Sequence, residues 1–190
     1  MNETTHNLLD DVAEILISEE RIRERTREIA QSIIKDYEGI DDLLLICVLK
    51  GAFMFLADLS RELERPHCLD FMGGSSYGTH STVSSGAVRI VMDLKEDIAG
   101  RHVLIVEDII DSGHTLEYLL RSLHARSPAS IRICSLLSKP SRREVDVPFD
   151  YIGFEIPDEF VVGYGLDFGE LYRNLPFIAI LKPEVFADII

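Results

Sequence analysis

The sequence predicts an α/β fold with a twisted, mainly parallel sheet flanked by helices. Two uninterrupted apolar runs, residues 43–49 and 103–106, are typical of strands buried on both faces of a parallel sheet. A helical spacing of apolar side chains follows each run, over residues 52–63 and 116–123. In open α/β sheets built this way, ligands bind at the carboxyl ends of the strands. A site is therefore expected where these strands end.

Composition limits the number of domains and the kinds of partner. The chain has 190 residues, which suffices for one domain with a sizeable core and is short for two. Its net charge of −14 argues against general binding to nucleic acid or to membrane surfaces, because both need basic patches. Anionic substrates must therefore be received locally, by metal ions, backbone amides and a few basic side chains.

Cysteine usage and the N-terminus point to the cytoplasm. Cys47, Cys68 and Cys134 are odd in number and irregular in spacing, which favours free thiols in a reducing compartment over a disulfide framework. Residues 1–11 are polar and acidic, unlike a secretory leader. No apolar run reaches the roughly 20 residues that a membrane span needs.

The first helix is expected over residues 18–37. Ser18 can cap it, Glu19 and Glu20 suit its first turn, and Gly39 ends it. Apolar side chains recur on one face at Ile22, Ile29 and Ile33. The many Arg and Glu residues between them are typical of a solvated, ion-paired face rather than a binding surface.

Several further strands are expected from short apolar or alternating runs. They lie at residues 67–72, 88–92, 131–137 and 177–181, with two more β-rich segments around the Pro157-Asp158 turn. Residues 73–86 are expected to form a long polar loop. Loops of this length are uncommon inside a compact domain and often serve as lids, although the composition fits a hairpin tip equally well.

The segment after residues 103–106 combines acids with a turn suited to phosphate. Glu107 and Asp108 are expected to end the strand, and residues 111–115 open the next helix. Unpaired N–H groups at a helix N-terminus favour a phosphate, whereas carboxylates accept hydrogen bonds from hydroxyls and bind hard cations. A sugar phosphate with Mg²⁺ satisfies both halves. The alternative is an acidic strand end that only caps the helix.

Residues 107–115 resemble the phosphoribosyl-pyrophosphate-binding signature of the type I phosphoribosyltransferases. Matches between about residues 43 and 181 narrow the resemblance to the hypoxanthine-guanine phosphoribosyltransferases. This resemblance implies purine salvage, with transfer of the 5-phosphoribosyl group of phosphoribosyl pyrophosphate to N9 of hypoxanthine or guanine, giving IMP or GMP and pyrophosphate. It also implies Mg²⁺ as cofactor, a hood formed by about residues 140–190 and part of the N-terminus, and a homodimer or homotetramer.

For phosphoribosyl pyrophosphate, the resemblance implies a site drawn from several segments. Lys50-Gly51 matches the family's pyrophosphate loop, residues 75–78 match its mobile catalytic loop, and Arg173 matches an arginine that contacts pyrophosphate. By residue type alone, Lys50 is a turn lysine and Arg173 a surface arginine; the position of His114 has no interpretation. The implied set is Lys50, Gly51, Ser75, Ser76, Tyr77, Glu107, Asp108, Asp111, Ser112, Gly113, His114, Thr115 and Arg173.

For the purine, the resemblance implies residues from the last third of the chain. Lys139 matches a lysine that donates to the exocyclic oxygen of a 6-oxopurine, and a donor-only ammonium disfavours adenine. Phe160 would stack on the ring, the Val161 backbone would meet its edge, and Asp111 would act as the general base at purine N7. The implied purine-binding set is Lys139, Phe160, Val161 and Asp167, and the implied Mg²⁺ ligands are Glu107, Asp108 and Asp167.

Three alternatives stay open at this point. A relative that prefers xanthine would differ in only two or three contacts around ring position 2. A phosphoribosyltransferase-like regulator that binds RNA is disfavoured by the acidic balance and by the retained Asp111, Lys139 and Arg173. A phosphoacceptor receiver domain would carry its acidic pair on the first strand, whereas more than a hundred residues precede it here. Neither a Walker loop nor a Gly-x-Gly-x-x-Gly motif is present to support nucleotide hydrolysis or dinucleotide redox chemistry.

Overall fold

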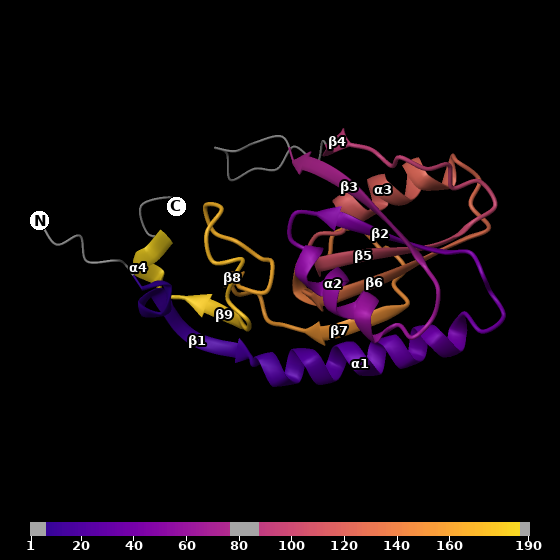
Figure 1. Ribbon diagram of the computed structural model, residues 1–190. Helices are drawn as coiled ribbons and strands as arrows, with labels where there is room; N and C mark the ends of the chain where they lie inside the picture. The colour runs from indigo at the N-terminus through magenta and orange to yellow at the C-terminus, as the bar shows by residue number, and fades with distance from the viewer. Residues whose placement is uncertain (1–6, 77–87, 187–190) are drawn as a thin grey trace, which may run out of the picture.

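The computed structural model describes residues 7–76 and 88–186, which contain two sheets (Figure 1). The larger sheet consists of β2 (Leu43–Leu49), β3 (Cys68–Ser76), β4 (Val88–Met92), β5 (His102–Ile110), β6 (Ser130–Ser138) and β7 (Tyr151–Glu155). Its strand order is β4-β3-β2-β5-β6-β7, and only β4 runs antiparallel to its neighbour. The predicted fold class, a mainly parallel α/β sheet with flanking helices, is therefore confirmed.

The three longer helices cover the two faces of this sheet. They are α1 (Glu19–Asp36), α2 (Phe53–Glu62) and α3 (His114–His124). The short α4 (Pro183–Phe186) and the 3₁₀ turn η1 (Leu8–Asp11) lie beside the smaller sheet, and a second 3₁₀ turn, η2 (Pro140–Arg142), follows β6. Ser18 caps α1 as predicted, since its hydroxyl accepts the N–H of Arg21. Figure 1 shows α1 and α2 on one side of the sheet and α3 on the other. None of the described helices has the length and apolar character needed to span a bilayer.

Side chains of β2 alternate between two cores, which explains why this strand is apolar throughout. Leu43, Leu45 and Cys47 pack with α1 and α2, whereas Leu44 and Ile46 pack with α3. Each of these side chains is fully buried. A strand with two covered faces has no solvent-facing position for a polar residue, so the apolar run is uninterrupted.

Two expected strand ends are wrong. Glu107 and Asp108 do not end their strand, because β5 continues to Ile110 through pairing with β6. The loop expected from residue 73 begins later, because residues 73–76 extend β3 and pair with the antiparallel β4. In both cases the backbone hydrogen bonds of a neighbouring strand prevail over polar or glycine-rich local sequence.

The smaller sheet joins the two ends of the chain. It consists of β1 (Val12–Ile17), β8 (Val161–Val162) and β9 (Ile178–Leu181), in the order β1-β9-β8. Tyr172 joins the segment between β8 and β9 to η1, since its hydroxyl donates to Asp11 Oδ2 at 2.6 Å. The hood expected from about residue 140 stays a prediction; β7, which follows that residue, belongs to the larger sheet.

Candidate active site

Three neighbouring cavities open where the parallel strands end, and all three are lined by Ile109. The Ser112 cavity, of about 220 Å³, lies at the start of α3. The Lys50 cavity, of about 280 Å³, lies beside the end of β2. The Lys139 cavity, of about 560 Å³, lies between the end of β6 and the segment leading into β8. Shared lining residues make them adjoining compartments of one region.

In the Ser112 cavity, a helix N-terminus is left uncapped. Gly113 has φ +95° at the N-cap of α3, and no side chain caps the helix. A Cβ on Gly113 would lie 2.9 Å from the carbonyl oxygen of Val145, so only glycine fits this close approach. Ser112, Gly113 and Thr115 all line the cavity. The N–H groups of this first turn, together with the helix dipole, suit an anion.

His114 turns towards the segment after η2. Its Nε2 lies 2.9 Å from Glu144 Oε2. The backbone N–H groups of Glu144 and Val145 both donate to the carbonyl oxygen of Ser112, at 3.0 and 3.1 Å. His114 therefore belongs to a set of contacts that joins this segment to the turn before α3.

Glu107, which is buried, and Asp108, which is half-buried, carry carboxyl groups at the junction of the Ser112 and Lys50 cavities. Burial, followed by the adjacent Asp108, raises the pKa of Glu107 well above its ordinary value. Burial likewise raises the pKa of Asp108 to about 6. A Cβ on Gly51 would lie 1.5 Å from Asp108 Oδ2, so the end of β2 rests directly on this carboxyl group. Two adjacent desolvated acids favour a cation beside them.

The three implied Mg²⁺ ligands are not brought together as one cluster. Among the described residues, no group of three or more His, Cys, Asp or Glu side chains could hold a metal ion. Asp167 lines the Lys50 cavity with Asp108, but it pairs with Arg173, with Oδ1 2.8 Å from Nη2. The Glu107-Asp108 pair still fits a cation whose remaining ligands are oxygens of a bound substrate.

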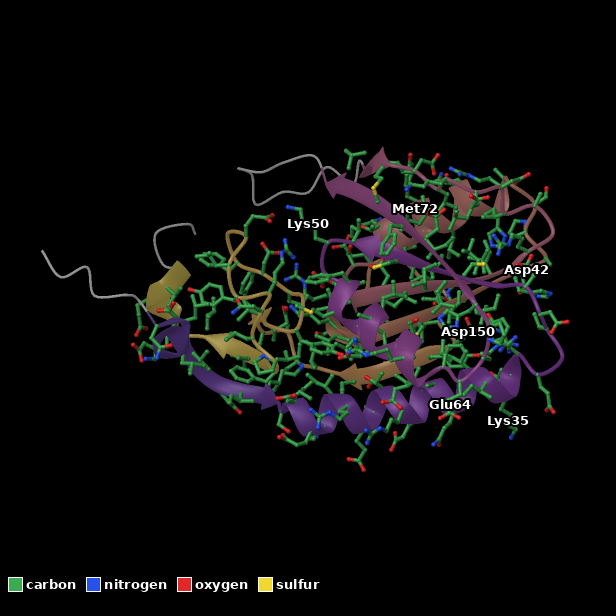
Figure 2. All side chains as sticks on the ribbon, in the orientation of Figure 1. Lys35, Asp42, Lys50, Glu64, Met72 and Asp150 are labelled. Carbon is green, nitrogen blue, oxygen red and sulfur yellow. The ribbon has the colours of Figure 1, made fainter. Side chains whose placement is uncertain are left out.

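The Lys50 cavity is bordered by a network of opposite charges. Glu170 lies between two cations, 2.7 Å from Lys50 Nζ and 3.3 Å from Arg173 Nη2, and Figure 2 shows Lys50 beyond the end of β2. Arg173 Nη1 also donates to the carbonyl oxygen of Gly165 at 2.8 Å. The Leu49–Lys50 peptide bond is cis. Sequence reasoning missed Glu170, since an exposed glutamate in a loop carries no local signal.

In the Lys139 cavity, an ammonium, a ring and apolar side chains surround one space. Lys139 is buried, with Nζ 3.9 Å from Asp158 Oδ1. Phe160 is 46% exposed and meets Phe168 edge to face, with centroids 5.6 Å apart. Val161 and Leu166 complete an apolar wall. A flat heterocycle with an acceptor at one edge matches this lining.

Asp111 lines both the Ser112 and the Lys139 cavities. Its Oδ1 lies 2.9 Å from Nε of Arg142, and Nη1 of Arg142 lies 3.4 Å from Asp158 Oδ1. Sequence reasoning missed Arg142 and Asp158. The only hint was proximity in sequence, since Arg142 follows Lys139 by three residues.

The expected catalytic-loop residues are only partly covered. Ser75 and Ser76 end β3 and pair with β4. Tyr77 lies outside the described residues. Every other residue expected to bind substrate lines at least one of the three cavities, with His114 as the exception.

Comparison with known families gives a consistent match. The family model described as phosphoribosyl transferase domain matches residues 12–169. The hypoxanthine-guanine phosphoribosyltransferase of Bacillus subtilis is 50% identical over 176 residues, which cover 93% of this chain and 97% of the relative. The bifunctional TilS/HprT protein of Listeria monocytogenes is 48% identical over 98% of this chain, but the chain spans only 28% of that relative's length.

Solved structures agree with the sequence match. A hypoxanthine phosphoribosyltransferase from Staphylococcus aureus superposes with a TM-score of 0.90 at 44% identity, covering 97% of this chain and 99% of the other. The enzyme from Trypanosoma cruzi, in complex with the product IMP, gives a TM-score of 0.86 at 45% identity, with 93% and 97% covered.

Proposed function

This chain belongs to the phosphoribosyl transferase family, and from that premise we propose that it salvages 6-oxopurines. The reaction joins N9 of hypoxanthine or guanine to C1 of phosphoribosyl pyrophosphate, giving IMP or GMP and releasing pyrophosphate. The observation that carries this proposal is the meeting of three cavities at Ile109, each suited to a different part of the reactants. Similarity to enzymes named for this activity supports it.

Phosphoribosyl pyrophosphate would span the Ser112 and Lys50 cavities. Its 5′-phosphate takes the N–H groups at the start of α3, and its ribose hydroxyls take Glu107 and Asp108 as acceptors. Its diphosphate lies beside Lys50, Gly51 and Arg173, where cations and backbone amides spread the charge of the leaving group. Lys50 and Arg173 must then exchange Glu170 for phosphate oxygens.

The purine would occupy the Lys139 cavity. The Lys139 ammonium donates to the exocyclic oxygen, Phe160 stacks on the ring, and the Val161 backbone meets the ring edge. An ammonium cannot accept a hydrogen bond from an amino group, so an adenine amino group at this position leaves Lys139 unpaired. The cavity therefore favours hypoxanthine and guanine.

Asp111 is proposed as the general base. Because it lines the cavities proposed for both the 5′-phosphate and the purine, it lies between the ribose and the base. It would take the proton from purine N7 as N9 attacks C1. Its Oδ1 faces Nε of Arg142 at 2.9 Å, so this pair must loosen when the purine enters. A positioned base typically contributes about 10² to 10⁴ in rate.

Mg²⁺ is proposed as the cofactor. The Glu107-Asp108 pair fits it, because burial of two adjacent carboxyl groups favours a cation beside them. When bound, the ion would neutralise charge on the ribose and diphosphate oxygens. Asp167 lines the same cavity and becomes available as a further ligand if Arg173 turns to the diphosphate.

We also propose a homodimer or homotetramer that covers an open part of the larger sheet. On the sheet face that α1 and α2 cover elsewhere, Leu69, Phe71 and Val91 are 45%, 37% and 65% exposed. Contiguous exposed apolar side chains of this kind mark association surfaces. Phe71→Lys should therefore lower the molar mass measured by light scattering, whereas an unchanged mass would remove this surface from the interface.

The cellular location and the domain organisation of the protein are proposals as well. Cys47, Cys68 and Cys134 carry free thiols, as expected in a reducing cytoplasm. We propose a single domain over residues 1–190, in which the smaller sheet and the segments beside it act as the hood over the site.

An activity panel tests the proposed reaction. Hypoxanthine, guanine, xanthine and adenine are each incubated with phosphoribosyl pyrophosphate and Mg²⁺, and nucleotide formation is followed by chromatography. We expect IMP and GMP, with little or no AMP. A preference for xanthine would contradict the proposed specificity for hypoxanthine and guanine. Formation of no nucleotide at all would refute the proposed reaction.

A further inference from the structure

The segment between β8 and β9 rests directly on the end of β2. It carries Asp167 and Arg173, which line the Lys50 cavity, and Glu170, which pairs with Lys50 and Arg173. A Cβ on Gly165 would lie 2.0 Å from the carbonyl oxygen of Gly51, so the two backbones touch with no side chain between them. Small displacements of this segment therefore change the geometry around the proposed diphosphate site.

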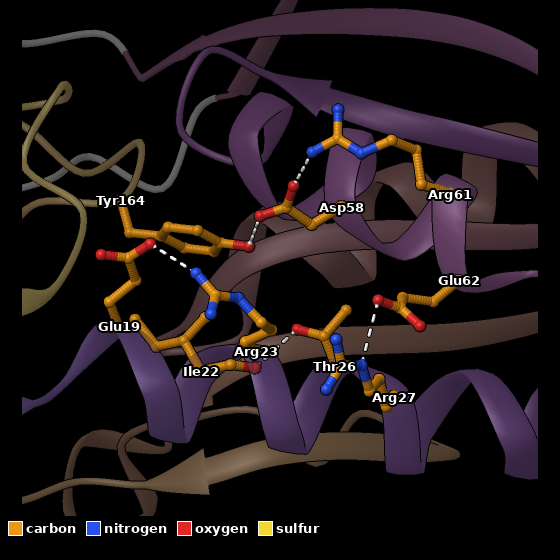
Figure 3. Close-up of polar contacts among 9 residues, drawn as sticks. All are labelled: Glu19, Ile22, Arg23, Thr26, Arg27, Asp58, Arg61, Glu62 and Tyr164. Carbon is orange, nitrogen blue, oxygen red and sulfur yellow. Dashed lines mark hydrogen bonds and ion pairs between the residues drawn. The ribbon is translucent and has the colours of Figure 1, made fainter.

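Tyr164 connects this segment to α2. Its hydroxyl donates to Asp58 Oδ2 at 2.5 Å, and Asp58 also pairs with Arg61 (Figure 3). Tyr164 adopts φ +48° between Gly163 and Gly165, at +97° and +102°, so the turn aims its ring at the helix. Burial, followed by the hydrogen bond to Asp58, raises the pKa of Tyr164. The phenol therefore stays a neutral donor at physiological pH.

The hydrogen bond to Asp58 adds to the packing of the Tyr164 ring in the core formed with α1 and α2. Tyr164 and Asp58 line a cavity of about 450 Å³ between α1, α2 and the segment before β9. The charged side chains drawn in Figure 3 pair with one another, as in Arg23–Glu19 at 2.7 Å and Arg27–Glu62 at 3.3 Å. These pairs leave no convergent unpaired groups for a ligand among the residues drawn. The segment is held against α2 by the packed Tyr164 ring and by the hydrogen bond to Asp58, which borders this open space.

We propose that Tyr164 is a positioning residue for the diphosphate site. Its hydrogen bond to Asp58 fixes the segment of residues 163–175 relative to α2, and α2 itself begins directly after Lys50-Gly51. The restraint reaches Arg173 through Gly165, whose N–H donates to the Arg173 carbonyl at 2.9 Å and whose carbonyl accepts from Arg173 Nη1 at 2.8 Å. Tyr164 thereby sets the position of Arg173 without touching substrate.

The structure provides a matched control, Tyr151. Its hydroxyl donates to Asp36 Oδ2 at 2.8 Å and accepts from Arg132 Nη1 at 2.8 Å. Like Tyr164, it is a buried tyrosine bonded to a carboxylate near an arginine, but it lines none of the three site cavities. Tyr151→Phe therefore removes a similar hydrogen bond at a distance from the proposed diphosphate site.

The kinetic test rests on the proposed function and compares Tyr164→Phe with Tyr151→Phe. We expect Tyr164→Phe to raise KM for phosphoribosyl pyrophosphate about three- to tenfold, with kcat and KM for hypoxanthine within about twofold of wild type. Asp58→Ala should reproduce this pattern. Asp58→Asn keeps a hydrogen-bond acceptor, so its KM for phosphoribosyl pyrophosphate should stay close to the wild-type value. Tyr151→Phe should leave all three constants unchanged. Equal constants in the two tyrosine variants would overturn the proposal.

Hydrogen exchange tests the restraint without any assay of activity. Amides of residues 163–175 should exchange faster in Tyr164→Phe than in wild type, and at the wild-type rate in Tyr151→Phe. Unchanged exchange in Tyr164→Phe would contradict the restraint, even in a chain that proved inactive. Failure of the purine panel in wild type would refute only the proposed reaction, so the two failures are distinguishable.

Discussion

The two sides of the site are built in different ways. The side proposed to bind the ribose phosphate comes from one contiguous segment, residues 107–115, which forms the end of β5, a turn and the start of α3. The side proposed to bind the purine and the diphosphate is assembled from residues 50–51, 139–142, 158–167 and 170–173. Strand pairing fixes the first, while the second depends largely on ion pairs between side chains.

This difference predicts which side changes when substrate binds. Lys50 and Glu170 pair at 2.7 Å, yet their side chains are 65% and 64% exposed, and exposed pairs of this kind contribute only about 0 to 1 kcal/mol. Such pairs can be exchanged for phosphate oxygens at little cost. Glu107 and Asp108 lie within the paired strand β5, so we expect their backbone to change little when substrate binds.

The largest expected effect lies where the two sides meet, at Asp111. Asp111→Asn keeps the size of the side chain but removes the base, so kcat should fall by about 10² to 10⁴ while KM for phosphoribosyl pyrophosphate changes little. Steady-state kinetics with hypoxanthine measure both. A variant with unchanged turnover would remove Asp111 from the base role.

A smaller effect is expected on the assembled side, at Lys139. Lys139→Ala should lower kcat/KM for hypoxanthine about 10- to 100-fold and erode the preference for hypoxanthine over adenine, because the ammonium that lines that cavity is lost. Lys35→Ala, at an exposed lysine on α1, serves as the control. Intact selectivity in Lys139→Ala would refute the assignment.

Desolvation of Asp108, on the contiguous side, should make the free energy of unfolding depend on pH. The pKa of Asp108 is raised from 3.8 to about 6, so the folded state is favoured when this group is protonated. Its contribution is fully present below about pH 4, is lost as pH rises towards 6, and amounts to at most about 3 kcal/mol.

Asp108→Asn should therefore raise the free energy of unfolding more at pH 8 than at pH 4, measured by urea denaturation without substrate. The exposed Asp146→Asn serves as the control, with no such difference expected. An equal change at both pH values would show that the carboxyl group of Asp108 is not desolvated.

The smallest expected effect concerns Glu170, which pairs with Lys50 and Arg173 and is proposed to compete with the diphosphate for them. Glu170→Gln should lower KM for phosphoribosyl pyrophosphate by about two- to threefold at low salt, and by less at high salt, where exposed charges are screened. Glu24→Gln, at an exposed position on α1, should have no effect. A raised KM would show that Glu170 supports the site rather than competing for it.

Local sequence predicted the contiguous side and much of the fold. The buried strand at Leu43–Leu49 followed from its apolar run, and the start of α3 followed from small residues before a helical spacing. Strand pairing could not be read locally, so β5 and β3 proved longer than expected and β1 was not anticipated.

The assembled side was only partly predictable, because its contacts join residues far apart in sequence. Lys50 meets Glu170 and Tyr164 meets Asp58 across more than a hundred residues. An exposed glutamate and a tyrosine in a β-rich segment look the same in sequence whether or not they have such partners. Lys139 and Arg173 were found only through the family resemblance.

A crystal structure of the protein with IMP, pyrophosphate and Mg²⁺ tests most directly whether the three cavities are one site. We predict the 5′-phosphate at Ser112–Thr115, the purine between Lys139 and Phe160, and pyrophosphate beside Lys50, with Arg173 turned away from Glu170. Ligands bound elsewhere, or phosphate and purine occupying separate crevices, would contradict this account.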